Sequence, residues 1–168
     1  MPATGLDVFD KTLQTTNIWL NEIMDDLGPD RKLAYRALRA VLHALRDRLA
    51  VDEAAHFGAQ LPLLVRGIFY DAWHPAGKPD RIRSEEEFLE RVAAELSDVR
   101  PVNMRDAVRS VMKAINLHVS PGQLDDVKAQ LPEQIRRLWP EKQTSDIRAS
   151  EGAAREPALA GGNRNMEG

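Results

Sequence analysis

Two short motifs place a carboxylate three residues before a histidine, Glu53-Ala-Ala-His56 and Asp71-Ala-Trp-His74. On a helix such residues share a face, and paired motifs of this kind with further glutamates build di-iron sites in four-helix bundles. Glu53 and His56 fall in a short predicted helix, whereas Asp71 and His74 enter a segment broken by proline. These four residues are the candidates for a metal site, a small enzyme or a ligand carrier. The pattern favours a simpler interpretation, a solvated first helical turn, so we expect no metal and no cofactor.

The remaining histidines favour structural roles. His43 borders an apolar helical stripe, and Lys113 occupies the matching place later in the chain, which predicts an exposed flank. His118 falls at the predicted end of a helix, where a cation is favourable. No nucleophile–histidine–carboxylate arrangement, G-x-S-x-G, H-E-x-x-H or phosphate-binding glycine loop is present. The sequence therefore favours a non-catalytic protein with no catalytic residues.

The composition excludes several classes of protein. The 168 residues carry a formal net charge of −3 and no cysteine, which excludes disulfides and thiolate chemistry. Proteins that grip phosphates usually carry a basic excess, so we expect no nucleic-acid partner. The basic residues of the second predicted helix, Arg46 among them, are interpreted as a solvated surface. No apolar run of about 18 residues or more occurs and the first residues do not resemble a signal peptide, so we expect no membrane span and a cytoplasmic location.

The sequence matches itself when it is shifted by 70 positions. Residues 37–42, Ala-Leu-Arg-Ala-Val-Leu, meet residues 107–112, Ala-Val-Arg-Ser-Val-Met, and Ala-Gln-Leu-Pro at 59–62 recurs at 129–132. Upstream, a shift of 69 aligns Trp19 with Phe88 and Leu20 with Leu89. These matches include polar as well as apolar positions. They predict two tandem pseudo-repeats of about 70 residues.

Apolar residues recur at helical spacing throughout both copies. In the first copy they predict helices along Phe9–Leu27, from Asp30 to Leu49, over 52–59 and from Pro62. Helix-start signals in the second copy lie at Ser84 and Ser120, each followed three residues later by Glu or Gln. No useful stretch alternates with a period of two. The predicted fold is an all-α bundle of about eight helices.

The chain divides into four predicted segments. The first helical repeat spans 1–70, an inter-repeat linker rich in Pro and Gly spans 71–83, and the second repeat spans 84–140. The last segment, 141–168, has few large apolar residues and is predicted to be disordered. We expect the two repeats to pack against each other, because a core of about 70 residues is marginal alone.

Three polar positions match between the copies: Arg39 with Arg109, Gln60 with Gln130, and Arg66 with Arg136. They either hydrogen-bond helix ends in the same way twice or line two equivalent grooves for a partner. The linker adds an aromatic and charged group, because Trp73 and His74 precede Lys78. The candidate partner-binding residues are Trp73, His74, Lys78, Arg66 and Arg136.

The block Ala-Gln-Leu-Pro-Leu-Leu-Val-Arg-Gly-Ile-Phe-Tyr-Asp-Ala-Trp at 59–73 resembles a bacterial family known as domain of unknown function 2267. The shorter Gln-Leu-Pro at 130–132 and the helix over 33–49 carry the same resemblance, which covers about residues 7 to 139. It implies a helical fold and a bacterial origin, and it brings no catalytic residue, substrate or cofactor. The functional hypothesis is therefore a non-catalytic interaction or scaffold module that binds a protein partner or itself.

Overall fold

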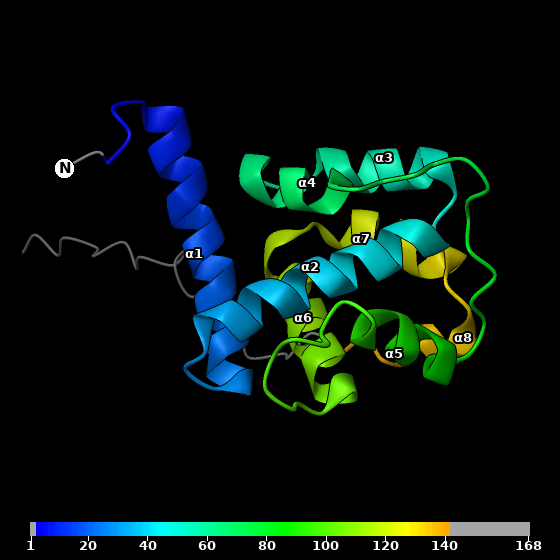
Figure 1. The fold of residues 1–168 in the computed structure, drawn as a ribbon. Helices are drawn as coiled ribbons and strands as arrows, with labels where there is room; N and C mark the ends of the chain where they lie inside the picture. The colour runs from blue at the N-terminus through cyan, green and yellow to red at the C-terminus, as the bar shows by residue number, and fades with distance from the viewer. Residues whose placement is uncertain (1–2, 142–168) are drawn as a thin grey trace, which may run out of the picture.

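The computed structural model describes residues 3–141, and within that range the chain forms eight helices and no strand. The all-α prediction is confirmed, and Figure 1 shows the arrangement. The helices are α1 (Asp7–Leu27), α2 (Arg31–Arg48), α3 (Val51–Ala59), α4 (Leu63–Tyr70), α5 (Glu85–Ala93), α6 (Met104–His118), α7 (Pro121–Gln130) and α8 (Glu133–Arg136).

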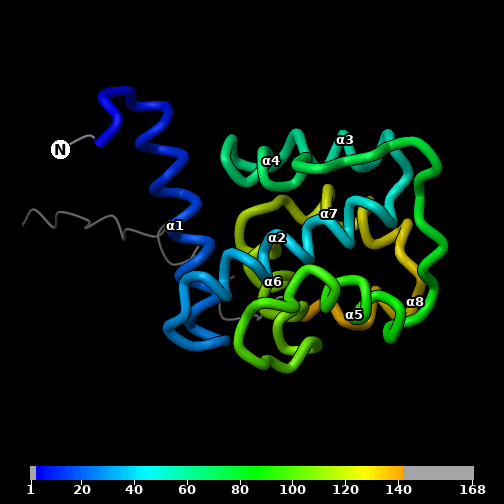
Figure 2. Tube along the Cα trace, in the orientation of Figure 1, coloured from blue at the N-terminus to red at the C-terminus, as the bar shows by residue number. Residues whose placement is uncertain are grey.

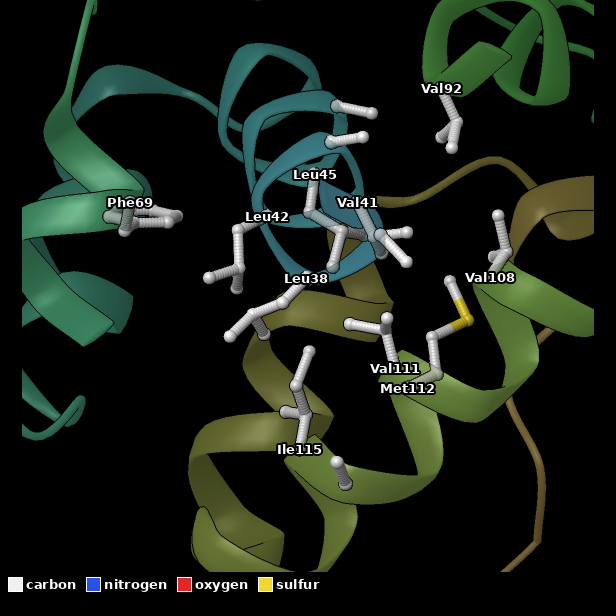
Figure 3. Close-up of a cluster of buried hydrophobic side chains, with 14 of the residues drawn as sticks. Leu38, Val41, Leu42, Leu45, Phe69, Val92, Val108, Val111, Met112 and Ile115 are labelled. Carbon is white, nitrogen blue, oxygen red and sulfur yellow. The ribbon is translucent and has the colours of Figure 1, made fainter. Parts of the chain in front are cut away.

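Helix α2 runs through the middle of the molecule, with α3 and α4 on one side and α5 on the other (Figure 1). It packs against α1, α4, α5 and α6. The apolar stripes predicted for α2 and α6 are both fully within the core: Leu38, Val41, Leu42, Leu45 and Leu49 from α2, and Val108, Val111, Met112, Ile115 and Val119 from α6. Figure 3 shows these stripes facing each other, with Phe69 of α4 and Val92 of α5 at either edge.

Local capping explains where several helices begin. The predicted caps are confirmed: Asp30 accepts a hydrogen bond from the Leu33 amide, Ser84 from the Glu87 amide and Ser120 from the Gln123 amide. Side-chain oxygens at these positions satisfy amides that have no partner within the helix. Helices α2, α5 and α7 therefore begin where the sequence places them.

The segment 71–83 between α4 and α5 is not helical, as predicted, and its path along the edge of the fold can be followed in Figure 2. It is held against the end of α2. The Asp80 amide donates to the Asp47 carbonyl oxygen at 2.7 Å, and Arg48 Nε donates to the Ile82 carbonyl oxygen at 2.7 Å. The linker is thus a fixed strap along α2. The predicted tail lies outside the described residues except for Glu141.

Candidate functional site

Helix α1 carries an apolar seam of which only half is buried. The seam residues follow the alternating three- and four-residue spacing of a helix–helix contact: Leu6, Phe9, Leu13, Thr16, Leu20, Ile23 and Leu27. Thr16, Leu20 and Ile23 are buried, and Leu27 packs against the core. Leu6, Phe9 and Leu13 are 52 %, 47 % and 41 % exposed. The helical stripe therefore continues into solvent at Phe9 and Leu13, because α1 extends beyond the helices that cover its second half (Figure 1).

The start of α4 lies beside this exposed half of α1. The Leu64 amide donates to Thr12 Oγ1 at 2.9 Å, and α1 and α4 are in contact. Leu63 and Leu64 are themselves 49 % and 37 % exposed. We call Leu6, which precedes α1, Phe9 and Leu13 of α1, and Leu63 and Leu64 of α4 the α1 surface. Neighbouring exposed apolar residues of this size are characteristic of interaction sites.

The structure gives most of the predicted partner-binding residues of the linker intramolecular contacts. Trp73 is half-buried, packs against the core and lies beside Tyr70, with ring centroids 5.3 Å apart. Lys78 Nζ lies 2.9 Å from Asp80 Oδ1. His74 is exposed. Binding of a partner at these residues stays a prediction, and the geometry shows what Trp73 and Lys78 do for the fold itself.

Arg66 and Arg136 bind the carbonyl ends of the preceding helices. Arg66 Nε donates to the Gly58 carbonyl oxygen at 3.0 Å, and its Nη2 donates to the Leu61 carbonyl oxygen at 3.0 Å. Arg136 repeats this geometry seventy positions later, with Lys128 at 3.1 Å and Leu131 at 2.9 Å. Each guanidinium thus satisfies carbonyls that a helix end leaves without partners.

Replacing Arg66 tests this structural role. We expect Arg66→Ala to lower the free energy of unfolding by about 2 kcal/mol, because charged hydrogen bonds to the end of α3 are lost. Arg66→Lys should lose most of the same amount, since an ammonium cannot reproduce the planar fork. Urea unfolding followed by circular dichroism measures both. An unchanged midpoint in both variants would remove the structural explanation.

A buried ionic cluster joins α2, the linker and α5. Arg46 and Asp47 are only 3 % and 2 % exposed, so the prediction that Arg46 lies on a solvated face is wrong. Arg46 Nη1 donates to the carbonyl oxygens of Phe69 at 2.7 Å and Asp71 at 2.9 Å, and its Nε donates to Asp47 Oδ1 at 2.9 Å. Arg91 of α5 donates to Asp47 Oδ2 at 2.9 Å. Buried charges of this kind persist where they are paired and hydrogen-bonded.

His43 belongs to the same polar face of α2 and is 2 % exposed, so the predicted exposed flank is wrong. Its Nε2 lies 2.8 Å from the Ile68 carbonyl oxygen, and its Nδ1 lies 3.0 Å from Glu95 Oε1. A carbonyl oxygen only accepts, so Nε2 carries a proton. His43 therefore links α4 to the segment after α5 as a structural residue.

The ionic cluster predicts acid sensitivity. Burial is the largest single influence on the pKa of Asp47 and raises it. The hydrogen bonds from Arg46 and Arg91 and the positive charges of Arg46 and Lys78 together outweigh burial and hold that pKa below its ordinary value. A depressed folded-state pKa means that ionised Asp47 stabilises the fold above the unfolded pKa of about 3.9, and this contribution disappears as the pH falls through the folded value.

We therefore expect the melting temperature of the wild type to fall more steeply below about pH 4 than that of Asp47→Asn. Thermal unfolding between acid and neutral pH measures both slopes. The variant should be less stable at neutral pH and lose less on acidification. Parallel pH profiles would contradict the role given to the Asp47 carboxylate.

The alternative metal residues are not gathered into one site. Glu53 Oε1 accepts a hydrogen bond from Gln123 Nε2 at 3.2 Å, and Asp71 Oδ2 accepts from Arg39 Nη1 at 2.5 Å, which lowers the pKa of Asp71. Across residues 3–141 no group of three or more His, Cys, Asp or Glu side chains is placed to hold a metal ion. The arrangement thus offers no support for a centre shared by Glu53, His56, Asp71 and His74.

The fold and its surface define an all-α protein with a structural ionic core and an exposed apolar helix face. Residues 16–138 match the family described as "Uncharacterized conserved protein (DUF2267)", so the chain belongs to that family. The resemblance found in the sequence is thereby confirmed. No curated protein matches the sequence. Among the described residues, none of the helices has the length and apolar character needed to cross a membrane.

Proposed function

We propose that this protein is a non-catalytic interaction module that binds an apolar helix, from a protein partner or from a second copy, at the α1 surface. The observation that carries the proposal is the continuous seam of α1. Its second half is buried against the protein's own core, and Leu6, Phe9 and Leu13 continue the same spacing into solvent. A seam with this spacing fits another helix, whose side chains insert between those of α1. Cytoplasmic location and bacterial origin remain predictions.

The proposal includes the division into two pseudo-repeats, 1–70 and 84–140, joined by the linker 71–83. The matched carbonyl contacts of Arg66 and Arg136 support it. The packing between the two halves also supports this division. Gln123 donates a hydrogen bond to Glu53, and Gln123 is the residue that matches Glu53 in the second copy. Such a self-matched contact is what a pseudo-twofold axis between two repeats would place there.

A second pair of contacts supports the same pseudo-twofold relation. Lys113 of α6 lies 3.3 Å from Asp26 of α1, and His43 of α2 lies 3.0 Å from Glu95 after α5. A shift of 70 positions matches His43 with Lys113, and a shift of 69 matches Asp26 with Glu95. The first helix of each repeat therefore packs against the second helix of the other repeat. In this arrangement the exposed first half of α1 is the part that extends beyond this contact between the repeats.

Substitution of the seam tests the proposed surface. We expect Phe9→Ser with Leu13→Ser to abolish binding at the α1 surface while the fold is kept, because both side chains are exposed and lie outside the buried core. Ile18→Ser is the matched control, since Ile18 is 46 % exposed on the same helix but lies off the seam. Sedimentation equilibrium across the micromolar range shows whether wild type self-associates and whether only the seam variant prevents it.

If the wild type is monomeric, the next test is for binding of a different protein. A photo-crosslinker at Leu13, used in the native host, should then capture a partner, and capture should be lost with Phe9→Ser and kept with Ile18→Ser. The proposal is wrong if the wild type is monomeric and no crosslink depends on the seam. It is also wrong if self-association survives both serine substitutions.

A further inference from the structure

A cleft of about 620 Å³ lies on one face of α6, away from the α1 surface. Its floor carries Asp106, Arg109 and Lys113, which recur at helical spacing opposite the apolar face of α6 that packs on α2. Its walls include Asp26, Leu27, Val102, Leu117 and Pro140. Volumes of this size hold small molecules, and a mixture of apolar walls with a few fixed polar groups is typical of such sites.

The polar side chains of the cleft are held in place by the protein. Ser110 and Asn116 line it although they are 4 % and 6 % exposed. Ser110 Oγ donates to Asp26 Oδ2 at 3.1 Å, and Asn116 Nδ2 donates to the Pro140 carbonyl oxygen at 2.9 Å. Arg109 Nη1 donates to the Leu138 carbonyl oxygen at 3.2 Å. Asn116 and Arg109 each keep further N–H donors for a ligand. Because the contacts above already fix these side chains, the site requires little reorganisation on binding.

Arg39 shows which ligand chemistry suits Arg109. Arg39, the matching arginine of α2, donates from Nη1 to Asp71 Oδ2 at 2.5 Å. Arg109 forms no ion pair among residues 3–141, and it lines the cleft. A guanidinium with free N–H groups binds a carboxylate strongly and with defined geometry. A carboxylate is therefore the group that the floor of the cleft is equipped to take.

Asp106 adds the opposite charge. It lies one helical turn before Arg109, is exposed, and makes no ion pair within the described part of the chain. A simple anion in the cleft would be repelled by this carboxylate, whereas an ammonium group would be attracted. Leu27, Val102 and Leu117 line the same cleft and supply apolar contact. Arg109 and Asp106 together therefore favour a small molecule that carries both charges.

We propose that the α6 cleft binds a small zwitterion of the amino-acid or short-peptide class, with its carboxylate on Arg109 and its ammonium group on Asp106. The apolar part of the ligand rests against Leu27, Val102 and Leu117. This site is separate from the α1 surface, and neither proposal depends on the other. It would give the protein a small-molecule site as well as an interaction surface.

The test is a titration of the full-length, nitrogen-15-labelled protein with glycylglycine, followed by NMR. Saturable shifts are expected for the Asn116 side-chain amide and the Arg109 Nε–H group. Succinate, which lacks the ammonium group, and 1,4-diaminobutane, which lacks the carboxylate, are compared at equal ionic strength and should bind at least tenfold more weakly. The three probes together separate zwitterion recognition from general attraction of charge.

Two variants and a control complete the test. Arg109→Gln and Asp106→Asn should each weaken glycylglycine binding at least tenfold. Arg105→Gln should leave it unchanged, because Arg105 lies on the same helix, pairs with Glu85 and is outside the cleft. Because Asp106 is exposed and has no ion-pair partner within residues 3–141, Asp106→Asn tests the site even if Arg109→Gln unfolds. Absence of saturable shifts, equal binding of all three probes, or unchanged binding by Asp106→Asn would overturn the proposal.

Discussion

Arg46→Met is expected to lower the free energy of unfolding by about 3–5 kcal/mol, which is a large share of the total for a protein of this size. Methionine keeps most of the apolar stem, so the loss isolates the polar contacts. Without the guanidinium, the buried Asp47 carboxylate and the carbonyl oxygens of Phe69 and Asp71 lose their shared donor. Urea unfolding monitored by circular dichroism measures the change.

Arg36→Met is the matched control on the same helix. Arg36 pairs with Asp98 at the surface, where both side chains are in contact with water. Ion pairs of that kind contribute about 0–1 kcal/mol, so this variant should unfold close to the wild type. Equal losses in the two methionine variants would show that burial of Arg46 and Asp47 is not what stabilises this part of the fold.

Phe69→Ala should cost about 3–5 kcal/mol through the cavity that it leaves between α2, α3 and α4. Phe69 is fully buried, its ring meets Phe57 edge-on with centroids 5.5 Å apart, and it faces Leu42 in Figure 3. Both the transfer of the ring to water and the loss of its neighbours' contacts contribute. Differential scanning calorimetry should record a markedly lower melting temperature.

Phe9→Ala provides the comparison for the same residue type. Phe9 lies on the exposed half of α1, so its removal should change the free energy of unfolding by about 0.5 kcal/mol or less. The two phenylalanines thus separate core packing from surface exposure within one chain. A large loss in Phe9→Ala would mean that the α1 surface is already buried in solution, for example against a second copy. A small loss of stability in Phe69→Ala would contradict the packing of Phe69 in the buried core.

The apolar core could be predicted from the sequence because each stripe contains its own evidence. Leu38, Val41 and Leu42 recur at helical spacing, and their burial needs only that some neighbour covers that face. The stripe of α1 is buried only in its second half, and the sequence could not show where burial ends. Spacing shows that Phe9 and Leu20 share one face, but it does not show how far along the helix the covering elements reach.

The polar side of α2 could not be predicted, because its evidence lies elsewhere in the chain. His43, Arg46 and Asp47 are ordinary surface residue types in isolation, and their partners Glu95 and Arg91 follow far downstream. Periodicity assigns such residues to solvent. The matching of Arg66 with Arg136 was a better guide, since the same polar residue at matched positions indicated a repeated helix-end contact, and both arginines make it.

The long-range pairing of α2 also determines when its contacts can form during protein synthesis. Arg91 follows Asp47 by 44 residues, and Glu95 follows His43 by 52. At a translation rate of about 5–20 residues per second, α2 is made, and leaves the ribosome, about 2–10 seconds before these partners do. During that interval the nascent chain holds a helix with an apolar face and an unpaired ionic face. The first half of the protein therefore cannot complete its contacts until the second half has been made.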